Sequence, residues 1–138
     1  MTLTAERVEE FLKGDGWPVE RVDRNTWRSG FRGDVNSFRF YVRLTDNWIF
    51  FTIVPFVVAP RVSDHARELY RHLLRLNREI NLAKFAIDDD DDVVLTVELP
   101  VEDAGDASMK DALEAMAYYA DRHYLEVLTI AQQGKKAS

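Results

Sequence analysis

The chain has 138 residues, of which 46% are hydrophobic and 12% aromatic, and its formal net charge is −6. This size and composition exclude a disordered chain and predict a single globular domain over residues 1–138. The lack of cysteine excludes disulfide frameworks and thiolate chemistry. The N-terminal stretch is acidic where a signal peptide would be apolar, so we expect a cytoplasmic protein.

Charge is divided unevenly along the chain. Residues 1–86 contain 14 basic and 11 acidic side chains, whereas residues 87–138 contain 4 basic and 13 acidic ones, so the two parts carry +3 and −9, which sum to −6. This asymmetry favours self-association or a charged partner, and two solvated faces of one domain would explain it equally.

Hydrophobic periodicity predicts a first helix over residues 4–13, which Gly14 ends. A first strand is predicted at residues 19–28, and a second at residues 37–44, where apolar and polar residues alternate. The third strand, residues 48–54, is apolar on both faces and is followed by a proline that should end it. We expect this strand to be central, with the second helix and a second subunit covering one of its faces.

The remaining elements are a second helix over residues 63–80, strands at residues 82–87 and 93–99, and a third helix that begins at Ser108 and stops near Gly134. The order is therefore α-β-β-β-α-β-β-α. It predicts an α+β fold with an antiparallel five-stranded sheet.

Two segments in the second half resemble a known family. "LLRLNREINLAKFAIDDDDDVVLTVELPVED" and "DALEAMAYYADRHYLEVL" are similar to the bacterial YbjN family, above all in Leu76-Asn77, "KFAID", "VELP" and "YYADRHY". The resemblance implies a fold like that of type III secretion chaperones. It also implies a non-enzymatic homodimer that binds other proteins, with the middle helix near the dimer interface, in a family labelled as sensory-transduction regulators.

Five consecutive aspartates, residues 88–92, separate the last two strands. An EF-hand calcium loop needs glycine at its sixth position and glutamate at its twelfth, but counting from Asp88 these are Val93 and Leu99. Aspartate tolerates turn conformations and bonds its own backbone, so we predict a hairpin turn and no metal site.

His65, Glu68 and His72 follow one side of the second helix, and imidazole and carboxylate groups are zinc ligands. Ligands on one helix are best placed one turn apart, whereas His65 and His72 are separated by about two turns. His123 belongs to another helix. We therefore predict no metal and no cofactor, and because no catalytic motif is present, no enzyme activity.

Two groups of arginines are expected to face outward. Arg39 and Arg43 flank Tyr41 on the second strand. The second helix carries about one arginine per turn: Arg67, Arg71, Arg75 and Arg78. Arginine favours bidentate contacts with carboxylates or phosphates. We predict that Arg39, Tyr41, Arg43, Arg67, Arg71 and Arg75 bind a protein partner. Single-stranded nucleic acid, or a solvated face with local pairs to Asp64 and Glu68, are the alternatives.

The other side of the second helix is apolar, and we predict the homodimer interface there, at Leu69, Leu73, Asn77 and Ile80. Asn77 would fix the register of the dimer, as a single asparagine does in coiled coils. In the alternative explanation its amide bonds backbone groups near the helix end. The sequence thus predicts a homodimeric, non-enzymatic protein-binding module, chaperone-like or regulatory, or alternatively a nucleic-acid-associated regulator.

Overall fold

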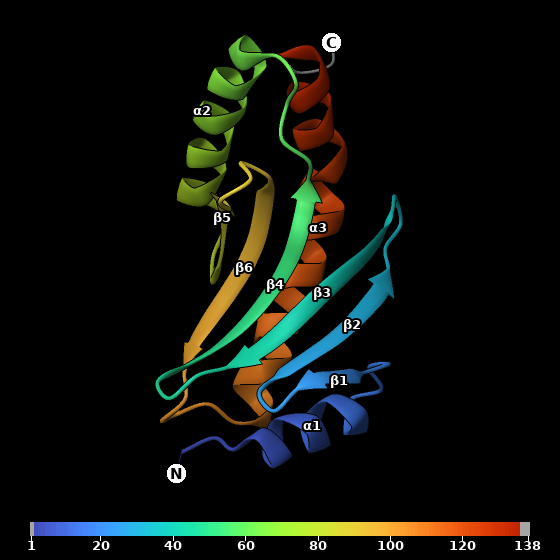
Figure 1. Ribbon diagram of the computed structural model, residues 1–138, viewed down its shortest axis with the longest axis vertical. Helices are drawn as coiled ribbons and strands as arrows, with labels where there is room; N and C mark the ends of the chain where they lie inside the picture. Colours follow the sequence, from blue (N-terminus) through green and yellow to red (C-terminus); the bar gives the residue numbers. More distant parts are fainter. Residues whose placement is uncertain (1, 136–138) are drawn as a thin grey trace.

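A single antiparallel sheet organises the computed structural model, which describes residues 2–135 (Figure 1). Six strands follow the order β1-β2-β3-β4-β6-β5. They are β1 (Glu20–Asp23), β2 (Thr26–Arg32), β3 (Ser37–Leu44), β4 (Trp48–Val57), β5 (Ala83–Ile87) and β6 (Val93–Pro100). The helices are α1 (Ala5–Gly14), α2 (Ser63–Glu79) and α3 (Asp106–Gln133). The predicted α+β fold is confirmed, but the sheet has six strands where five were predicted.

The prediction of five strands was wrong because residues 19–28 fold as a hairpin rather than as one strand. β1 and β2 run antiparallel, and the side chain of Asp23 accepts a hydrogen bond from the Asn25 backbone N–H at 2.9 Å. Asp and Asn in this arrangement favour turns because their side chains bond the backbone two residues away. The turn at residues 23–25 therefore divides the predicted strand into β1 and β2.

β4 also runs further than predicted. We expected Pro55 to end the strand, but β4 continues to Val57. The register between β4 and β6 shifts between Ile53 and Val57. Proline has no N–H to donate to a sheet, so it is tolerated where regular pairing is interrupted.

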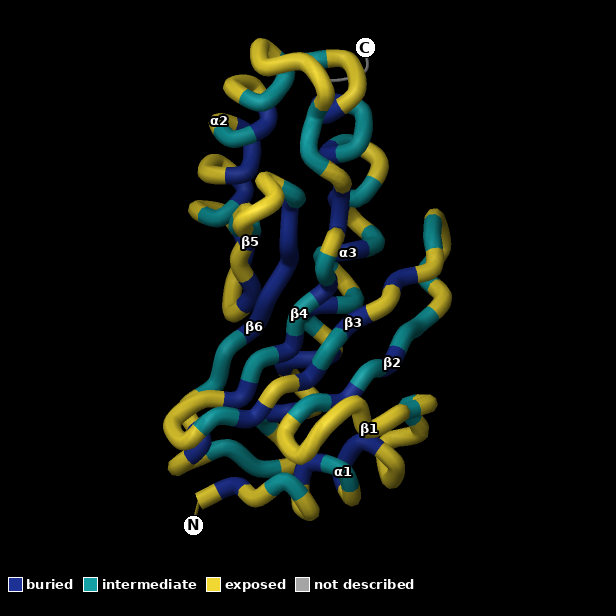
Figure 2. The backbone as a smooth tube through the Cα atoms, viewed as in Figure 1, coloured by how far each residue is buried: buried dark blue, intermediate teal, exposed yellow. Residues whose placement is uncertain are grey.

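The two faces of the sheet have different surroundings. A row of buried residues crosses five strands on one face: Trp27, Val42, Phe51, Val97 and Ala83. All three helices contribute to the single core on this side, and α3 runs behind the sheet in Figure 1. The next row, Arg28, Tyr41, Thr52, Thr96 and Lys84, points the other way. Figure 2 shows the resulting alternation of burial along β3 and β4.

No helix of residues 2–135 covers that second face. We expected α2 to cover it, but α2 packs against α3 and β5 because Leu69, Leu73 and Leu76 are buried in the shared core. α3 begins at Asp106, two residues before the predicted start, and ends before Gly134 as predicted; Gly134 has a left-handed conformation, which glycine adopts readily at helix ends. Within the described residues, no helix is both long and apolar enough to cross a membrane.

Candidate functional site

The uncovered side of the sheet, which we call the open face, is the first candidate surface. Phe50, Thr52 and Val54 of β4 lie half-buried there, although no helix of the described chain shields them. At the centre, the hydroxyls of Thr52 and Thr96 are 2.8 Å apart and hydrogen bonded. Half-buried apolar side chains beside a satisfied polar pair form a surface that a partner can cover at little cost in desolvation.

The predicted row on β3 lies on this open face. Arg39 and Arg43 are exposed and Tyr41 between them is half-buried. Neither arginine forms an ion pair with any residue of the range 2–135. Arg28 on the neighbouring strand differs, because its guanidinium lies 2.7 Å from a carboxylate oxygen of Glu20. That hydrogen bond holds the pKa of Glu20 below its ordinary value.

The outer edge of β2 is free along half its length. β1 pairs with β2 only as far as Arg28, so the outer side of residues 29–32 has no neighbouring strand in the part of the chain that the structure describes. Figure 1 shows β1 beside only the lower part of β2. Ser29 is 5% exposed, and its hydroxyl is buried without a hydrogen-bond partner. A groove of about 790 Å³ runs along this edge, and Gly30, Phe31 and Arg39 help to line it.

At the opposite edge of the sheet, which we call the closed edge, a single side chain bonds the middle residue of β5. The amide of Asn77 donates to the carbonyl oxygen of Phe85 at 2.9 Å, and its oxygen accepts from the Phe85 N–H at 2.7 Å. A neighbouring strand would make the same two bonds. These contacts match the explanation in which Asn77 bonds backbone groups, with Phe85 of β5 as its partner.

The residues predicted for the dimer interface lie mostly inside the single chain. Leu69, Leu73 and Ile80 are buried, and Asn77 is half-buried against β5. Their apolar surface is therefore used within the chain, and a role in dimerisation stays a prediction. The four arginines of α2 are all exposed on its outer side.

His65 and His72 have different neighbours, although their spacing places both along one side of α2. His72 turns toward α3, where its Nε2 lies 2.5 Å from Glu126 Oε2, and His123 Nδ1 lies 2.9 Å from Glu126 Oε1. Burial raises the pKa of Glu126, but the hydrogen bonds to His123 and His72 outweigh it, so the pKa lies below its ordinary value. His65 instead lies beside Gly134. The sequence placed Glu126 one turn after His123, and only the packing of α2 on α3 brings His72 to it.

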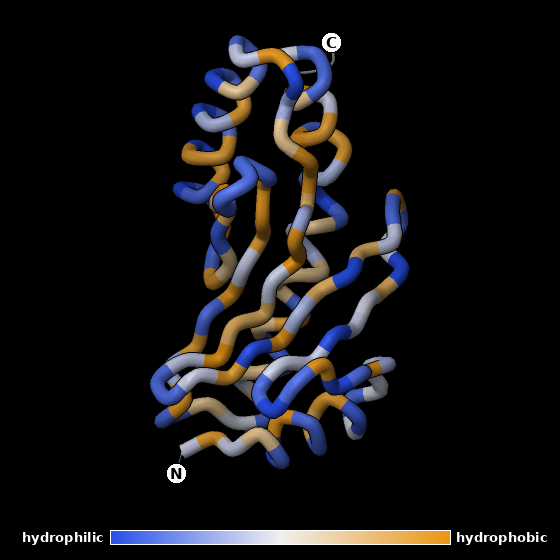
Figure 3. The backbone as a smooth tube through the Cα atoms, viewed as in Figure 1, coloured by the Kyte–Doolittle hydropathy of each residue, from blue (hydrophilic) through white to orange (hydrophobic). Residues whose placement is uncertain are grey.

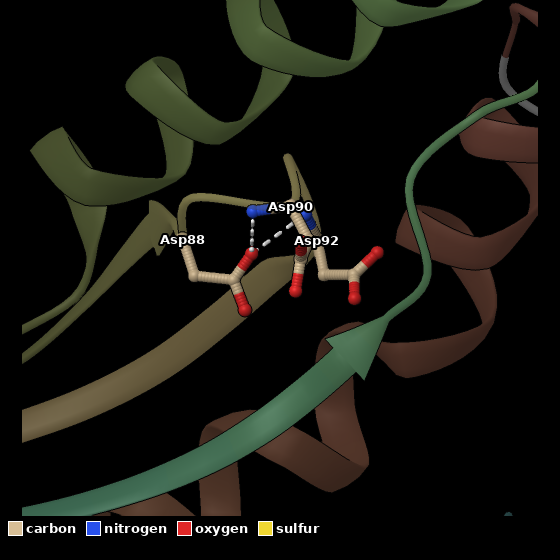
Figure 4. A group of neighbouring side chains, drawn as sticks. All are labelled: Asp88, Asp90 and Asp92. Carbon is tan, nitrogen blue, oxygen red and sulfur yellow. Dashed lines mark hydrogen bonds between the residues drawn. The ribbon is translucent and has the colours of Figure 1, made fainter.

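The aspartate run forms the predicted turn. The backbone N–H of Asp88 donates to the carbonyl oxygen of Asp92 at 3.0 Å, that of Asp91 donates to the carbonyl oxygen of Asp88 at 3.0 Å, and Asp91 has a left-handed φ of 63°. The carboxylates of Asp88, Asp90 and Asp92 are close enough together to hold a metal ion (Figure 4). However, Asp88 Oδ1 accepts from the N–H groups of Asp90 and Asp92, and Asp92 Oδ1 accepts from that of Ala59. These hydrogen bonds to backbone N–H groups explain why the carboxylates lie close together in the turn.

Comparison with known proteins identifies the fold. A family model for YbjN, described as "Putative bacterial sensory transduction regulator", matches residues 4–129. None of the curated proteins compared matches the chain.

Solved structures share the architecture at low sequence identity. A chain of the heterodimeric ExoU–SpcU complex from the type III secretion system of Pseudomonas aeruginosa is 14% identical with a TM-score of 0.63, over 93% of this chain and 99% of that one. A chain of the ExsC–ExsE complex is 16% identical, with a TM-score of 0.63 over 92% and 97%. An uncharacterized protein from Methanothermobacter thermautotrophicus is 10% identical, with a TM-score of 0.55 over 92% and 97%. The expected likeness to type III secretion chaperones is confirmed at the level of the fold.

Proposed function

The chain belongs to the YbjN family, and from this premise we propose that it is a non-enzymatic, homodimeric protein-binding module with a chaperone-like role. The observation that carries the proposal is the free edge of β2 beside the open face. The structural neighbours support it, since one is a chain of a heterodimeric complex from a type III secretion system and another is a chain of the HopA1–SchA chaperone–effector complex.

An extended segment of the partner binds along residues 29–32 of β2. An exposed strand edge offers a row of N–H and C=O groups, and an added strand satisfies them while pockets read its alternate side chains. Gly30 pairs with Arg39 across β2 and β3. Because Gly30 has no side chain, Arg39 has room to reach the groove along the edge, where it meets an acidic residue of the partner.

The homodimer is proposed at the C-terminal end of α2. Ile80 is buried there, but it is followed by Leu82, which is 52% exposed, and Ile87 of β5 is exposed as well. Leu82 precedes β5 and Ile87 ends it, and exposed apolar side chains along one edge strand favour association with a second copy. Leu69, Leu73 and Asn77 would support this contact from beneath. Light scattering at micromolar concentration should give the mass of a dimer, and a clean monomer would contradict this part.

The binding function is tested by charge reversal of two open-face residues, Arg39→Glu with Arg43→Glu. Partners are first isolated from a cell extract with the full chain and identified, and their affinities are then measured. A central contact of this kind costs about 2 kcal/mol or more, so binding should weaken at least tenfold. The matched control is Arg24→Glu with Arg122→Glu, which changes the net charge equally on exposed arginines elsewhere.

The measurement is repeated with single-stranded DNA. Unchanged affinity for the protein partner together with lost DNA binding would replace the proposed function by a nucleic-acid function. Equal losses in the double variant and in its control would show a non-specific charge effect and contradict the open face as the binding surface.

A further inference from the structure

The outer side of α2 carries a regular basic stripe with one apolar residue inside it. At 100° per residue, Arg67, Arg71, Arg75, Arg78 and Leu74 fall within about one third of the helix circumference. All five are exposed, and Leu74, at 72%, is the most exposed of the large hydrophobic residues described. Figure 3 shows the alternation of hydrophilic and hydrophobic segments along α2. The arginines extend over about 16 Å of helix.

The chain does not neutralise this stripe. None of the four arginines is within ion-pair distance of an acidic group of residues 2–135. Asp64 precedes the stripe, and Glu68 and Glu79 flank it on the same helix, yet the local pairs considered from the sequence do not form. Four guanidinium groups thus remain available for bidentate contacts with carboxylates.

α2 is held firmly from its inner side. Leu69, Leu73 and Leu76 are buried, His72 bonds Glu126 of α3, and Asn77 bonds β5 through two hydrogen bonds. A partner that binds the outer side therefore meets a helix that is already ordered. Binding to a preorganised surface costs less conformational entropy than binding to a flexible one.

We propose that the outer side of α2 binds an acidic amphipathic helix of the protein partner. This inference rests on the proposed protein-binding function and names a second contact for it. The arginines recur turn by turn, so a helix with carboxylates at the same spacing can meet them, with one apolar residue to cover Leu74. Helix-on-helix recognition of this kind uses anchors at i, i+3, i+4 and i+7.

Two other occupants fit less well. A second copy of the chain would place its own arginine stripe against this one, and like charges in contact oppose association. Nucleic acid offers phosphates but no apolar group on its backbone to cover Leu74, and the net charge of −6 repels it at long range.

The test uses the full chain and a synthetic helical peptide with glutamates at i, i+4, i+8 and i+11, the spacing of the four arginines, around one leucine. Its controls are a peptide of the same composition in scrambled order and an oligothymidine strand. Affinities are measured for the wild type, for Leu74→Ser, and for Arg67→Glu with Arg71→Glu. The variant Arg24→Glu with Arg122→Glu, at exposed arginines that belong to neither proposed surface, serves as a matched charge control.

The patterned peptide should bind at least tenfold more tightly than the scrambled one. The α2 double variant should lose at least tenfold in affinity, Leu74→Ser should lose several-fold, and Arg24→Glu with Arg122→Glu should keep wild-type affinity. Equal binding of both peptides, tighter binding of oligothymidine, or no effect of Leu74→Ser would each overturn the proposal. If the peptide fails while an isolated partner still depends on Arg39 and Arg43, the α2 contact falls and the proposed function stands.

Discussion

The two edges of the sheet differ in whether their outward backbone groups are bonded within the chain. At β5, Asn77 supplies a donor and an acceptor to Phe85 and takes the place of a neighbouring strand. At β2, residues 29–32 pair with β3 but have no strand on their outer side within the described chain, and the hydroxyl of Ser29 is buried without a partner. Proteins protect strand edges against unwanted pairing. An edge that is left open in the same molecule is therefore the better candidate for binding.

The largest effect is expected when the hydrogen bonds of Asn77 to the edge of β5 are removed. Replacing Asn77 by Ala removes both bonds to Phe85 and leaves two backbone groups without partners, so we expect a loss of about 2 kcal/mol in the free energy of unfolding. Urea denaturation measures it, with the exposed neighbour in Arg78→Ala as the control. Gel filtration should also show new self-association through β5. A loss no larger than that of the control would mean that the amide does not protect this edge.

The next prediction concerns the contact of α2 with Glu126 of α3, because α2 carries the Asn77 that bonds the edge of β5. The pKa of Glu126 is lowered in the folded state, so its contribution to stability is present above 4.5, its ordinary value. The contribution is lost as the pH falls through the lowered pKa. Glu126→Gln should cost about 1 kcal/mol at neutral pH, a figure kept small because the side chain is one-third exposed.

Stability of this variant is followed by thermal unfolding between pH 2 and pH 7, with the more exposed Glu114→Gln as the control. The wild type should lose stability on acidification more steeply than Glu126→Gln does. Parallel curves for the two would contradict a role for the histidine contacts in holding α2 on α3.

A smaller effect of opposite sign is expected at the open edge. Ser29→Ala removes a buried hydroxyl that has no partner, so the variant should be more stable by about 1 kcal/mol. Chemical denaturation measures the change, with the exposed Ser37→Ala as the control. If Ser29→Ala destabilises the chain, the hydroxyl is satisfied in solution and the β2 edge loses one of its distinguishing features.

The smallest effect concerns the aspartate turn next to the closed edge. Asp91 has a φ of 63°, a conformation that glycine adopts without strain, so Asp91→Gly should stabilise the chain by about 0.5 kcal/mol. Asp90→Gly has no such benefit and serves as the control. Differential scanning calorimetry should also show no shift in melting temperature with calcium. A calcium-dependent rise of several degrees would overturn the assignment of residues 88–92 as a turn alone.

The sequence by itself determined the elements and their order, because these depend on local patterns. Alternating residues placed β3, helical periodicity placed the buried side of α2, and Gly134 marked the end of α3. The outward direction of Arg39, Tyr41 and Arg43 followed from the same alternation. The hairpin of β1 and β2 was equally local, since its Asp-Arg-Asn turn is readable, although residues 19–28 were predicted as one strand.

Only the tertiary structure decided which of these surfaces meet and which stay open. The pairing of His72 with Glu126 joins residues 54 positions apart in the chain. The pairing of Asn77 with Phe85 and the length of β2 that β1 leaves free depend on how neighbouring elements pack against each other. Periodicity assigns a side chain to a face, but it does not say what covers that face. The same apolar stripe of α2 therefore suggested a dimer interface, whereas packing against α3 buries it within one chain.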